Sequence, residues 1–205
     1  MPAPGKLITL EGLDGSGKST LAAGLLDAFP ALTLLREPGG VVLAERIRAL
    51  VTDPELRVDA RAEALLYAAA RAQLVAEALG PLLAAGAPVL LDRFVDSSLA
   101  YQGAGRGLGV GEVRALSLFA TGGLMPHRTL LLRIDPAAGR ARQAARPGAA
   151  DRLEREPDAF FSAVGAAYEA LAAAEPERFV VLDAAEAPDA VLARARDAVA
   201  ATLAS

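Results

Sequence analysis

A glycine-rich octapeptide between an apolar run and a helical segment constrains this 205-residue chain more than any other feature. The segment Gly12–Ser19 reads GLDGSGKS and follows the apolar run Leu7–Leu10. It matches the pattern G-x-x-x-x-G-K-[ST], in which backbone N–H groups turn inward around phosphate oxygens. The alternative is a glycine-rich turn with an incidental lysine. Only two lysines occur in the chain, however, and one of them, Lys18, stands at the motif position.

The motif predicts nucleotide binding and gives its residues roles. Lys18 is expected to reach the β- and γ-phosphates of ATP, and the Ser19 hydroxyl is expected to bind Mg²⁺. Asp92 ends a second apolar run, Pro88–Leu91, and is the expected partner of Ser19 at the metal. In the alternative, Asp92 caps a following helix. The predicted ATP-binding residues are Gly12, Leu13, Asp14, Gly15, Ser16, Gly17, Lys18, Ser19 and Thr20.

Short apolar runs alternate with longer helical segments along the chain. This alternation predicts an α/β P-loop kinase fold, a five-stranded parallel sheet with helices on both faces and an arginine-rich lid. No repeat, linker or composition break is found, so residues 1–205 are expected to form a single domain. The expected strands are 7–10, 32–35, 88–91, 129–134 and 179–182, and the clearest helices are 18–29, 43–51 and 59–84.

Composition and charge argue against several other classes of protein. The absence of cysteine removes disulfides, thiolate metal sites and a cysteine nucleophile. A net charge of −4 argues against binding to a nucleic acid polymer. No signal peptide is indicated, and no apolar stretch reaches the roughly 18 residues of a membrane helix. A cytoplasmic protein without membrane contact is therefore expected, and the one histidine, His127, belongs to no motif.

Arginines gather in one segment, with six between positions 133 and 155. The stretch of about residues 140–152 predicts a lid, whose arginines stabilise charge on the γ-phosphate while closure excludes water. A solvated helix face with ion pairs to Glu154 and Glu156 is the alternative for part of the cluster. The lid residues assigned a catalytic role are Arg142, Arg146 and Arg152.

Tyr67 and Arg71 are four residues apart on a predicted helix and therefore share a face. An aromatic ring stacks on a base, and a guanidinium one turn later binds a phosphate. A core-facing tyrosine beside an arginine that extends to solvent is the alternative.

Four segments, in order, resemble motifs of the thymidylate kinase family. Glu11–Thr20 resembles its P-loop, Arg36–Gly40 its second motif, Asp92–Gly103 its third motif and Asp151–Glu154 the end of its lid. The resemblance covers the whole chain. It implies ATP·Mg²⁺-dependent phosphorylation of dTMP to dTDP, and a homodimer joined through helices.

The resemblance also implies roles for single residues. Arg93 resembles a catalytic arginine that bridges donor and acceptor phosphates, and Arg36 is similar to a second arginine on the acceptor phosphate. Asp14 resembles the carboxylate that receives the sugar 3′-hydroxyl, with a turn-stabilising aspartate as the alternative. The other substrate-binding residues are Tyr67 on the thymine ring, Arg71 on phosphate or base, Ser98 and Tyr101 at the thymine edge and ribose 2′ position, and Gln102 beside them.

The expected reaction is an in-line transfer that needs no strong general base, because the acceptor is already an anionic phosphate. A kinase for another nucleoside monophosphate or a deoxynucleoside is the nearest alternative. A nucleotide-binding switch without transfer activity is a further alternative, although it leaves residues 93–102 unexplained. The chain lacks the Asn-Lys-x-Asp tetrapeptide of GTPase switches.

Overall fold

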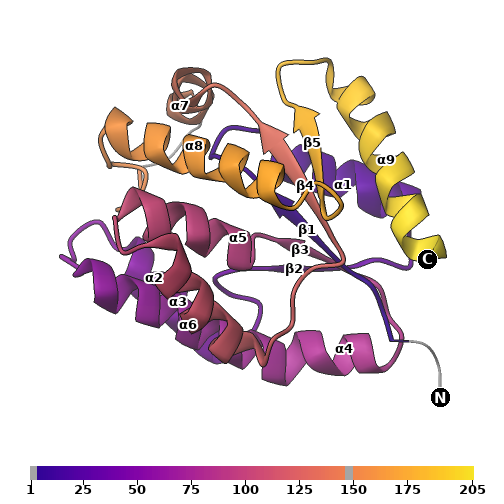
Figure 1. Cartoon of the computed structure of the whole chain (residues 1–205), viewed down its shortest axis with the longest axis horizontal. Coiled ribbons are helices and arrows are strands. Elements are labelled where there is room, and N and C mark those ends of the chain that lie inside the picture. Colours follow the sequence, from indigo (N-terminus) through magenta and orange to yellow (C-terminus); the bar gives the residue numbers. More distant parts are fainter. Residues whose placement is uncertain (1–3, 146–149) are drawn as a thin grey trace.

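A computed structural model of the chain describes residues 4–145 and 150–205. Five parallel strands form one central sheet in the order β2-β3-β1-β4-β5, with helices on both faces (Figure 1). This arrangement confirms the predicted α/β fold. The strands are β1 (Leu7–Glu11), β2 (Thr33–Arg36), β3 (Val89–Asp92), β4 (Arg128–Arg133) and β5 (Phe179–Asp183).

The central strand β1 is buried over its whole length, and its side chains alternate between the two faces of the sheet. Ile8 and Leu10 pack in one hydrophobic core with residues of α1 and α9. Leu7 packs in the other core, together with residues of α3, α5 and α8. Thr9 and Glu11 share the face of Leu7, so the Glu11 carboxylate enters the layer that α5 and α8 form.

Helices α1 and α9 cover the face of the sheet that carries Ile8 and Leu10. The remaining helices lie mainly on or beside the face that carries Leu7 (Figure 1). None of the helices in the two described segments has the length and apolar character needed to cross a membrane. The helices are α1 (Lys18–Ala28), α2 (Val42–Thr52), α3 (Ala60–Leu74), η1 (Val75–Leu79), α4 (Gly80–Ala84), α5 (Val95–Ser98), η2 (Leu99–Gly105), α6 (Val110–Thr121), α7 (Pro136–Ala144), α8 (Asp158–Ala174) and α9 (Pro188–Ala204).

The predicted helix over residues 59–84 is present, but a π-helical segment, η1, interrupts it. Pro81 follows this segment. Proline has no N–H to donate, and its ring collides with the carbonyl four residues earlier in a regular helix. The wider turn relieves that collision, and the N–H of Gly80 donates to Val75 O five residues back. The helix therefore continues past the proline.

Candidate active site

The glycine-rich loop connects β1 to α1, as the sequence predicts. Lys18 begins α1, is buried, and donates from Nζ to the carbonyl oxygens of Gly12 and Leu13, both at 3.1 Å. Burial and the nearby Arg93 guanidinium lower the pKa of Lys18 to about 8. The loop therefore holds a poorly hydrated ammonium group, which interacts strongly with an incoming anion.

The two predicted Mg²⁺ ligands lie in one cavity of about 250 Å³, which we call the P-loop cavity. Strand register places Asp92 opposite Leu10, at the start of the loop. Asp92 Oδ1 is buried and has no hydrogen-bond partner within the described part of the chain, and Ser19 and Lys18 line the same cavity. A buried carboxylate oxygen without a donor, close to a hydroxyl, fits a Mg²⁺ ion, which prefers oxygen ligands.

A second cavity of about 220 Å³ adjoins the first, and we call it the Tyr67 cavity. Its walls contain every predicted substrate-binding residue except Arg36. The two cavities share the lining residues Asp14, Glu37, Arg48 and Arg93. A molecule in one cavity therefore meets a molecule in the other at a boundary that carries two arginines.

Arg93 stands at this boundary. Its guanidinium donates to Gly12 O at 3.1 Å and to Asp14 Oδ1 at 2.6 Å, and it lies over the Tyr101 ring at 5.1 Å. Asp14 also forms an ion pair with Lys18 at 3.8 Å. The predicted bridging arginine is thus in contact with the backbone of the phosphate-binding loop.

Arg71 lies in the wall of the Tyr67 cavity with only 2% of its surface exposed, so it is not an arginine that extends to solvent. Its Nε donates to Glu37 Oε2 at 2.9 Å, and its Nη2 donates to Phe94 O and Ser98 Oγ, both at 3.0 Å. Tyr67 lines the same cavity, one helical turn earlier. These hydrogen bonds fix the Arg71 guanidinium in the wall of the cavity.

Tyr101 and Gln102 complete the wall of this cavity, and both are buried. The Tyr101 hydroxyl accepts a hydrogen bond from Arg93 Nη2 at 3.4 Å. The Gln102 amide donates to Glu63 Oε1 at 2.9 Å, which fixes the orientation of the amide. Burial raises the pKa of the Tyr67 and Tyr101 hydroxyls, so both remain protonated.

Arg36 is exposed and forms a two-point contact with the Glu45 carboxylate at 2.9 and 3.0 Å. It lines the P-loop cavity and not the Tyr67 cavity. Arg48, which is not among the predicted site residues, donates to Pro38 O at 3.0 Å and lines both cavities. Arg48 belongs to no motif, and only its position in space identifies it.

The lid arginines of α7 contact neighbouring backbone. Arg142 donates to Ala184 O at 3.1 Å, in the connection between β5 and α9. Arg140 donates to Glu156 O at 2.8 Å. Arg146 lies outside the described residues. A catalytic role for Arg142 and Arg146 remains a prediction.

Arg152, at the end of the lid segment, joins a buried cluster around Glu63, a residue that the sequence analysis missed. Glu63 has no exposed surface and accepts from Arg152 at 2.6 Å, from Arg106 at 3.0 Å and from Gln102 at 2.9 Å. Burial by itself raises the pKa of Glu63, but hydrogen bonds from Arg106 and Gln102 hold it below its ordinary value. Its spacing could have indicated it, because Glu63 lies one helical turn before Tyr67 and therefore on the same face of α3.

Helix α7 rests directly on the phosphate-binding loop. A Cβ atom added to Gly15 would lie 2.2 Å from Gly139 O, and one added to Gly139 would lie 2.9 Å from Asp14 O. Gly15 also has a φ of +80°, which side chains rarely adopt. Glycine at both positions therefore lets the base of the lid contact the loop backbone to backbone.

A phosphate-binding loop, a candidate Mg²⁺ site and a second cavity that meets the first at an arginine define a P-loop nucleotide kinase. The thymidylate kinase family model matches residues 10–195, and the chain belongs to this family. The thymidylate kinase of Deinococcus radiodurans is 50% identical over 189 residues, which cover 90% of this chain and 91% of that protein. The thymidylate kinase of Leifsonia xyli subsp. xyli is 50% identical over 197 residues, covering 94% and 93%.

Proposed function

We propose that this chain transfers the γ-phosphate of ATP to dTMP and releases dTDP and ADP. The observation that carries the proposal is the meeting of two cavities at Asp14 and Arg93. One cavity offers the loop and Lys18 to a triphosphate, and the other offers the Tyr67 ring and buried hydrogen-bonding groups to a base. The reacting phosphates meet at the shared boundary.

Positioning and charge account for the chemistry of these residues. Lys18 binds the β- and γ-phosphates, and Arg93 contacts the phosphoryl group as it moves between cavities. Arg48 and Arg36 add positive charge near the same boundary. Ser19 and Asp92 would hold Mg²⁺, which neutralises charge on the phosphates when it is bound.

The Tyr67 cavity suits a pyrimidine deoxynucleotide. The Tyr67 ring stacks on the base, and Arg71, Ser98 and Gln102 offer hydrogen bonds to its edge. The rigid Arg71–Ser98 contact limits the space at that edge, and Tyr101 occupies the region near the sugar.

Acceptor specificity gives the direct test. With ATP·Mg²⁺, we expect dTMP to stimulate ADP release most strongly among dTMP, dUMP, dCMP, UMP, AMP and thymidine. We expect dUMP to be about tenfold weaker in kcat/KM, because one methyl contact contributes about 1–3 kcal/mol. A different preferred acceptor would still support kinase activity, but it would contradict the assignment of the Tyr67 cavity to dTMP. Slow ATP turnover that no acceptor stimulates would favour a nucleotide-binding switch without transfer activity.

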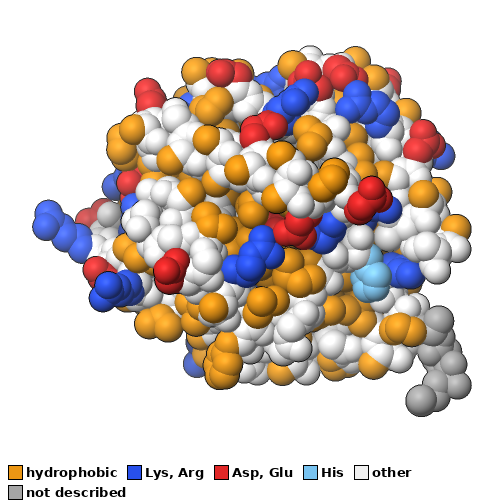
Figure 2. Space-filling view, viewed as in Figure 1, with side chains coloured by type: hydrophobic (Ala, Val, Ile, Leu, Met, Phe, Trp, Pro, Cys, Tyr) orange, Lys and Arg blue, Asp and Glu red, His pale blue; other side chains and the backbone are white. Residues whose placement is uncertain are grey.

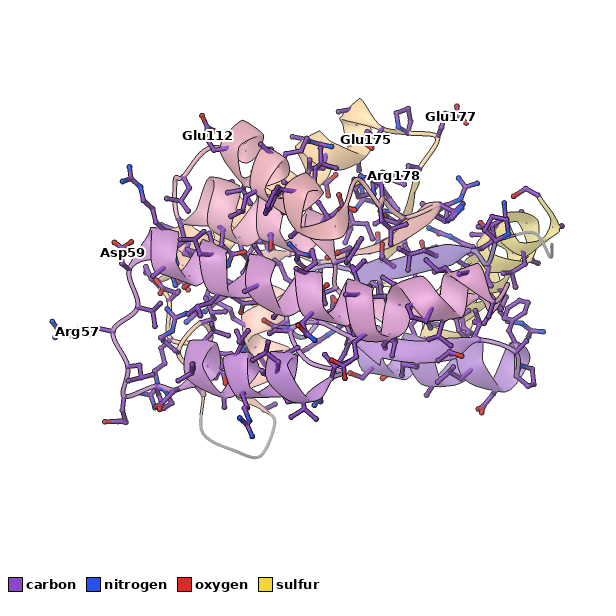
Figure 3. The ribbon with its side chains drawn as sticks, turned by 90° about the horizontal axis from the view of Figure 1, so that it is seen from below. Arg57, Asp59, Glu112, Glu175, Glu177 and Arg178 are labelled. Carbon is purple, nitrogen blue, oxygen red and sulfur yellow. The ribbon has the colours of Figure 1, made fainter. Side chains whose placement is uncertain are left out.

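We further propose that residues 1–205 act as a single domain, because the two largest hydrophobic cores lie on opposite faces of one sheet. A location in the cytoplasm is a separate part of this proposal. We also propose a homodimer through α2, α3 and α6, which lie side by side in Figure 3. The lower part of Figure 2, around α3, α4 and α6, carries mostly hydrophobic and neutral side chains. The exposed large hydrophobic residues of the proposed interface helices α2, α3 and α6 are Val42, Leu43, Leu50, Leu65 and Phe119.

Phe119 tests the homodimer, because 88% of its surface is exposed on α6. We expect Phe119→Glu to weaken the dimer by at least about 2 kcal/mol, roughly 30-fold in Kd, since it buries an unpaired charge at the interface. Analytical ultracentrifugation measures the change, and Ala170→Glu on the exposed face of α8 is the matched control. A Phe119→Glu protein as dimeric as the control would contradict this interface.

A further inference from the structure

Arg93 has a backbone conformation that a side chain adopts only at a cost. Its φ is +68°, and it is the one non-glycine residue with a positive φ in residues 4–145 and 150–205. This left-handed conformation is unfavourable for any residue with a Cβ atom. Its surroundings must therefore hold Arg93 in place.

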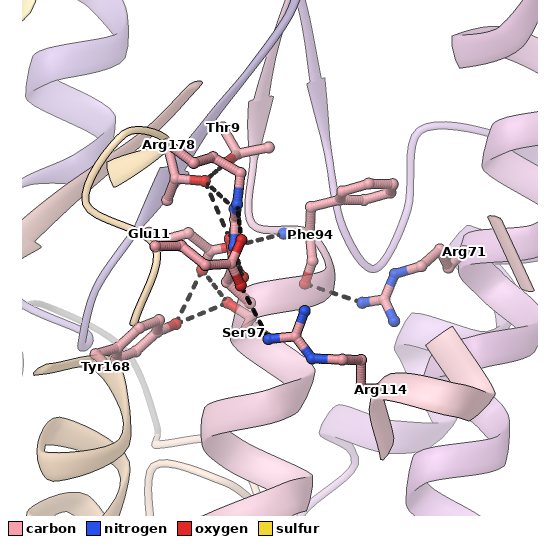
Figure 4. Close-up of polar contacts among 11 residues, drawn as sticks. Thr9, Glu11, Arg71, Phe94, Ser97, Arg114, Tyr168 and Arg178 are labelled. Carbon is pink, nitrogen blue, oxygen red and sulfur yellow. Dashed lines mark hydrogen bonds and ion pairs between the residues drawn. The ribbon is translucent and has the colours of Figure 1, made fainter. Parts of the chain in front are cut away.

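The end of β1 supplies the contacts that hold this backbone. The N–H of Arg93 donates to Leu10 O at 3.0 Å. The N–H of the next residue, Phe94, donates to Glu11 Oε1 at 2.8 Å, as the dashed line in Figure 4 marks. Peptide groups on both sides of the Arg93 Cα are thus bound by consecutive residues of one buried strand.

The second oxygen of Glu11 fixes the position of the Arg93 guanidinium through the Ser97 hydroxyl. The Ser97 hydroxyl donates to Glu11 Oε2 at 2.5 Å and accepts from Arg93 Nη1 at 3.1 Å. The Tyr168 hydroxyl donates to the same Oε2 at 2.9 Å (Figure 4). Because a serine hydroxyl has one hydrogen, donation to Glu11 turns its lone pairs toward the arginine.

Glu11 is a costly residue to keep at this position. It is fully buried, and burial together with the neighbouring Asp96 carboxylate raises its pKa to about 7. Because the pKa is raised from 4.5, this group stabilises the fold least above pH 7, where the carboxylate is charged. Ionisation of Glu11 therefore makes the fold less stable as the pH rises toward 7.

We propose that Glu11 is a positioning residue that fixes both the backbone and the guanidinium of Arg93 for phosphoryl transfer. One oxygen of Glu11 holds the backbone of Arg93 through the Phe94 N–H. The other oxygen holds its guanidinium through Ser97. The inference rests on the proposed function only in placing Arg93 against the transferred phosphate.

Asp96 provides the matched control, because it is equally buried but binds other groups. Its carboxylate accepts from Arg178 at 2.6 Å and from Thr129 at 3.0 Å, and these contacts anchor α5 to the sheet. Glu175 binds the same arginine, and Figure 3 labels Glu175 and Arg178, which lie in the connection between α8 and β5. Asp96→Asn thus disturbs the same layer without touching the Arg93 side chain.

A double-mutant cycle tests the proposal. We expect Glu11→Gln to lower kcat about tenfold to a hundredfold, with KM for ATP changed less than about threefold, because a small misplacement of Arg93 affects the transition state most. In an Arg93→Ala background, the same substitution should lower kcat by less than about twofold. Asp96→Asn should lower kcat by equal factors in both backgrounds.

Equal losses from Glu11→Gln in both backgrounds would overturn the inference. If Glu11→Gln does not fold, Tyr168→Phe takes its place in the cycle, with an expected loss of about threefold that also vanishes without Arg93. If the wild-type protein does not phosphorylate dTMP, the proposed function fails by itself. A crystal structure of Glu11→Gln then decides. The amide keeps one acceptor for the Phe94 N–H but presents a donor to Ser97, so the Arg93 guanidinium should move away from Ser97, and an unmoved guanidinium contradicts the inference.

Discussion

Replacing Lys18 with alanine is expected to lower kcat for dTMP phosphorylation by about a thousandfold, because charge on the transferred phosphoryl group loses its main fixed cation. The wild-type loop holds the ammonium between two carbonyl oxygens, so it is in place before ATP arrives. Binding of dTMP should change little, because Lys18 does not line the Tyr67 cavity.

Steady-state kinetics and calorimetric titration with dTMP separate the two effects. Lys6→Ala is the matched control, since Lys6 is the only other lysine and precedes β1 outside both cavities. It should retain wild-type kcat. A Lys18→Ala protein with unchanged kcat would refute the role of the loop in phosphate transfer.

Replacing Glu63 with glutamine is expected to lower the free energy of unfolding by about 3 kcal/mol, because breaking a buried ion pair leaves charge without compensation. Arg106 and Arg152 both donate to this carboxylate, and both are mostly buried. Glutamine has the same shape, so the loss reports charge and hydrogen bonding, not a cavity.

Denaturant unfolding near pH 7 measures this loss, and Glu186→Gln is its control. Glu186 forms an exposed pair with Arg194 at 2.8 Å, and such pairs contribute at most about 1 kcal/mol. The pKa of Glu63 lies below 4.5, so its stabilisation is present above pH 4.5 and is lost as the pH falls further. The difference between wild type and Glu63→Gln should therefore narrow in acid. A difference that stays below 1 kcal/mol at pH 7 would contradict the expected effect.

The phosphate-binding loop could be predicted from sequence because its chemistry is local. All of its ligating groups lie within Gly12–Ser19, and the flanking strand and helix leave their periodicity in the same short segment. The five strands could be predicted for a related reason, since buried parallel strands are short apolar runs. Their bounds shift by a residue or so, because pairing with neighbours decides where a strand ends.

The supporting carboxylates could not be predicted, because their partners are distant in the chain. Glu37 and Arg71 are 34 residues apart, Glu63 and Arg152 are 89 apart, and Glu11 and Tyr168 are 157 apart. Several of these residues lie in recognisable motifs, but a motif does not indicate which distant residue each side chain contacts. Only the stacking of helices on the sheet brings them together.

The contact between Gly15 and Gly139 has a consequence for how relatives of this chain diverge. A methyl group at either position would overlap the backbone of the other segment, so neither glycine tolerates replacement by itself. Change in the lid sequence is therefore restricted at Gly139, where helix α7 meets the loop. A relative that carries a side chain at either position has to move the loop and the helix apart, so the closeness of these two segments depends on both glycines together.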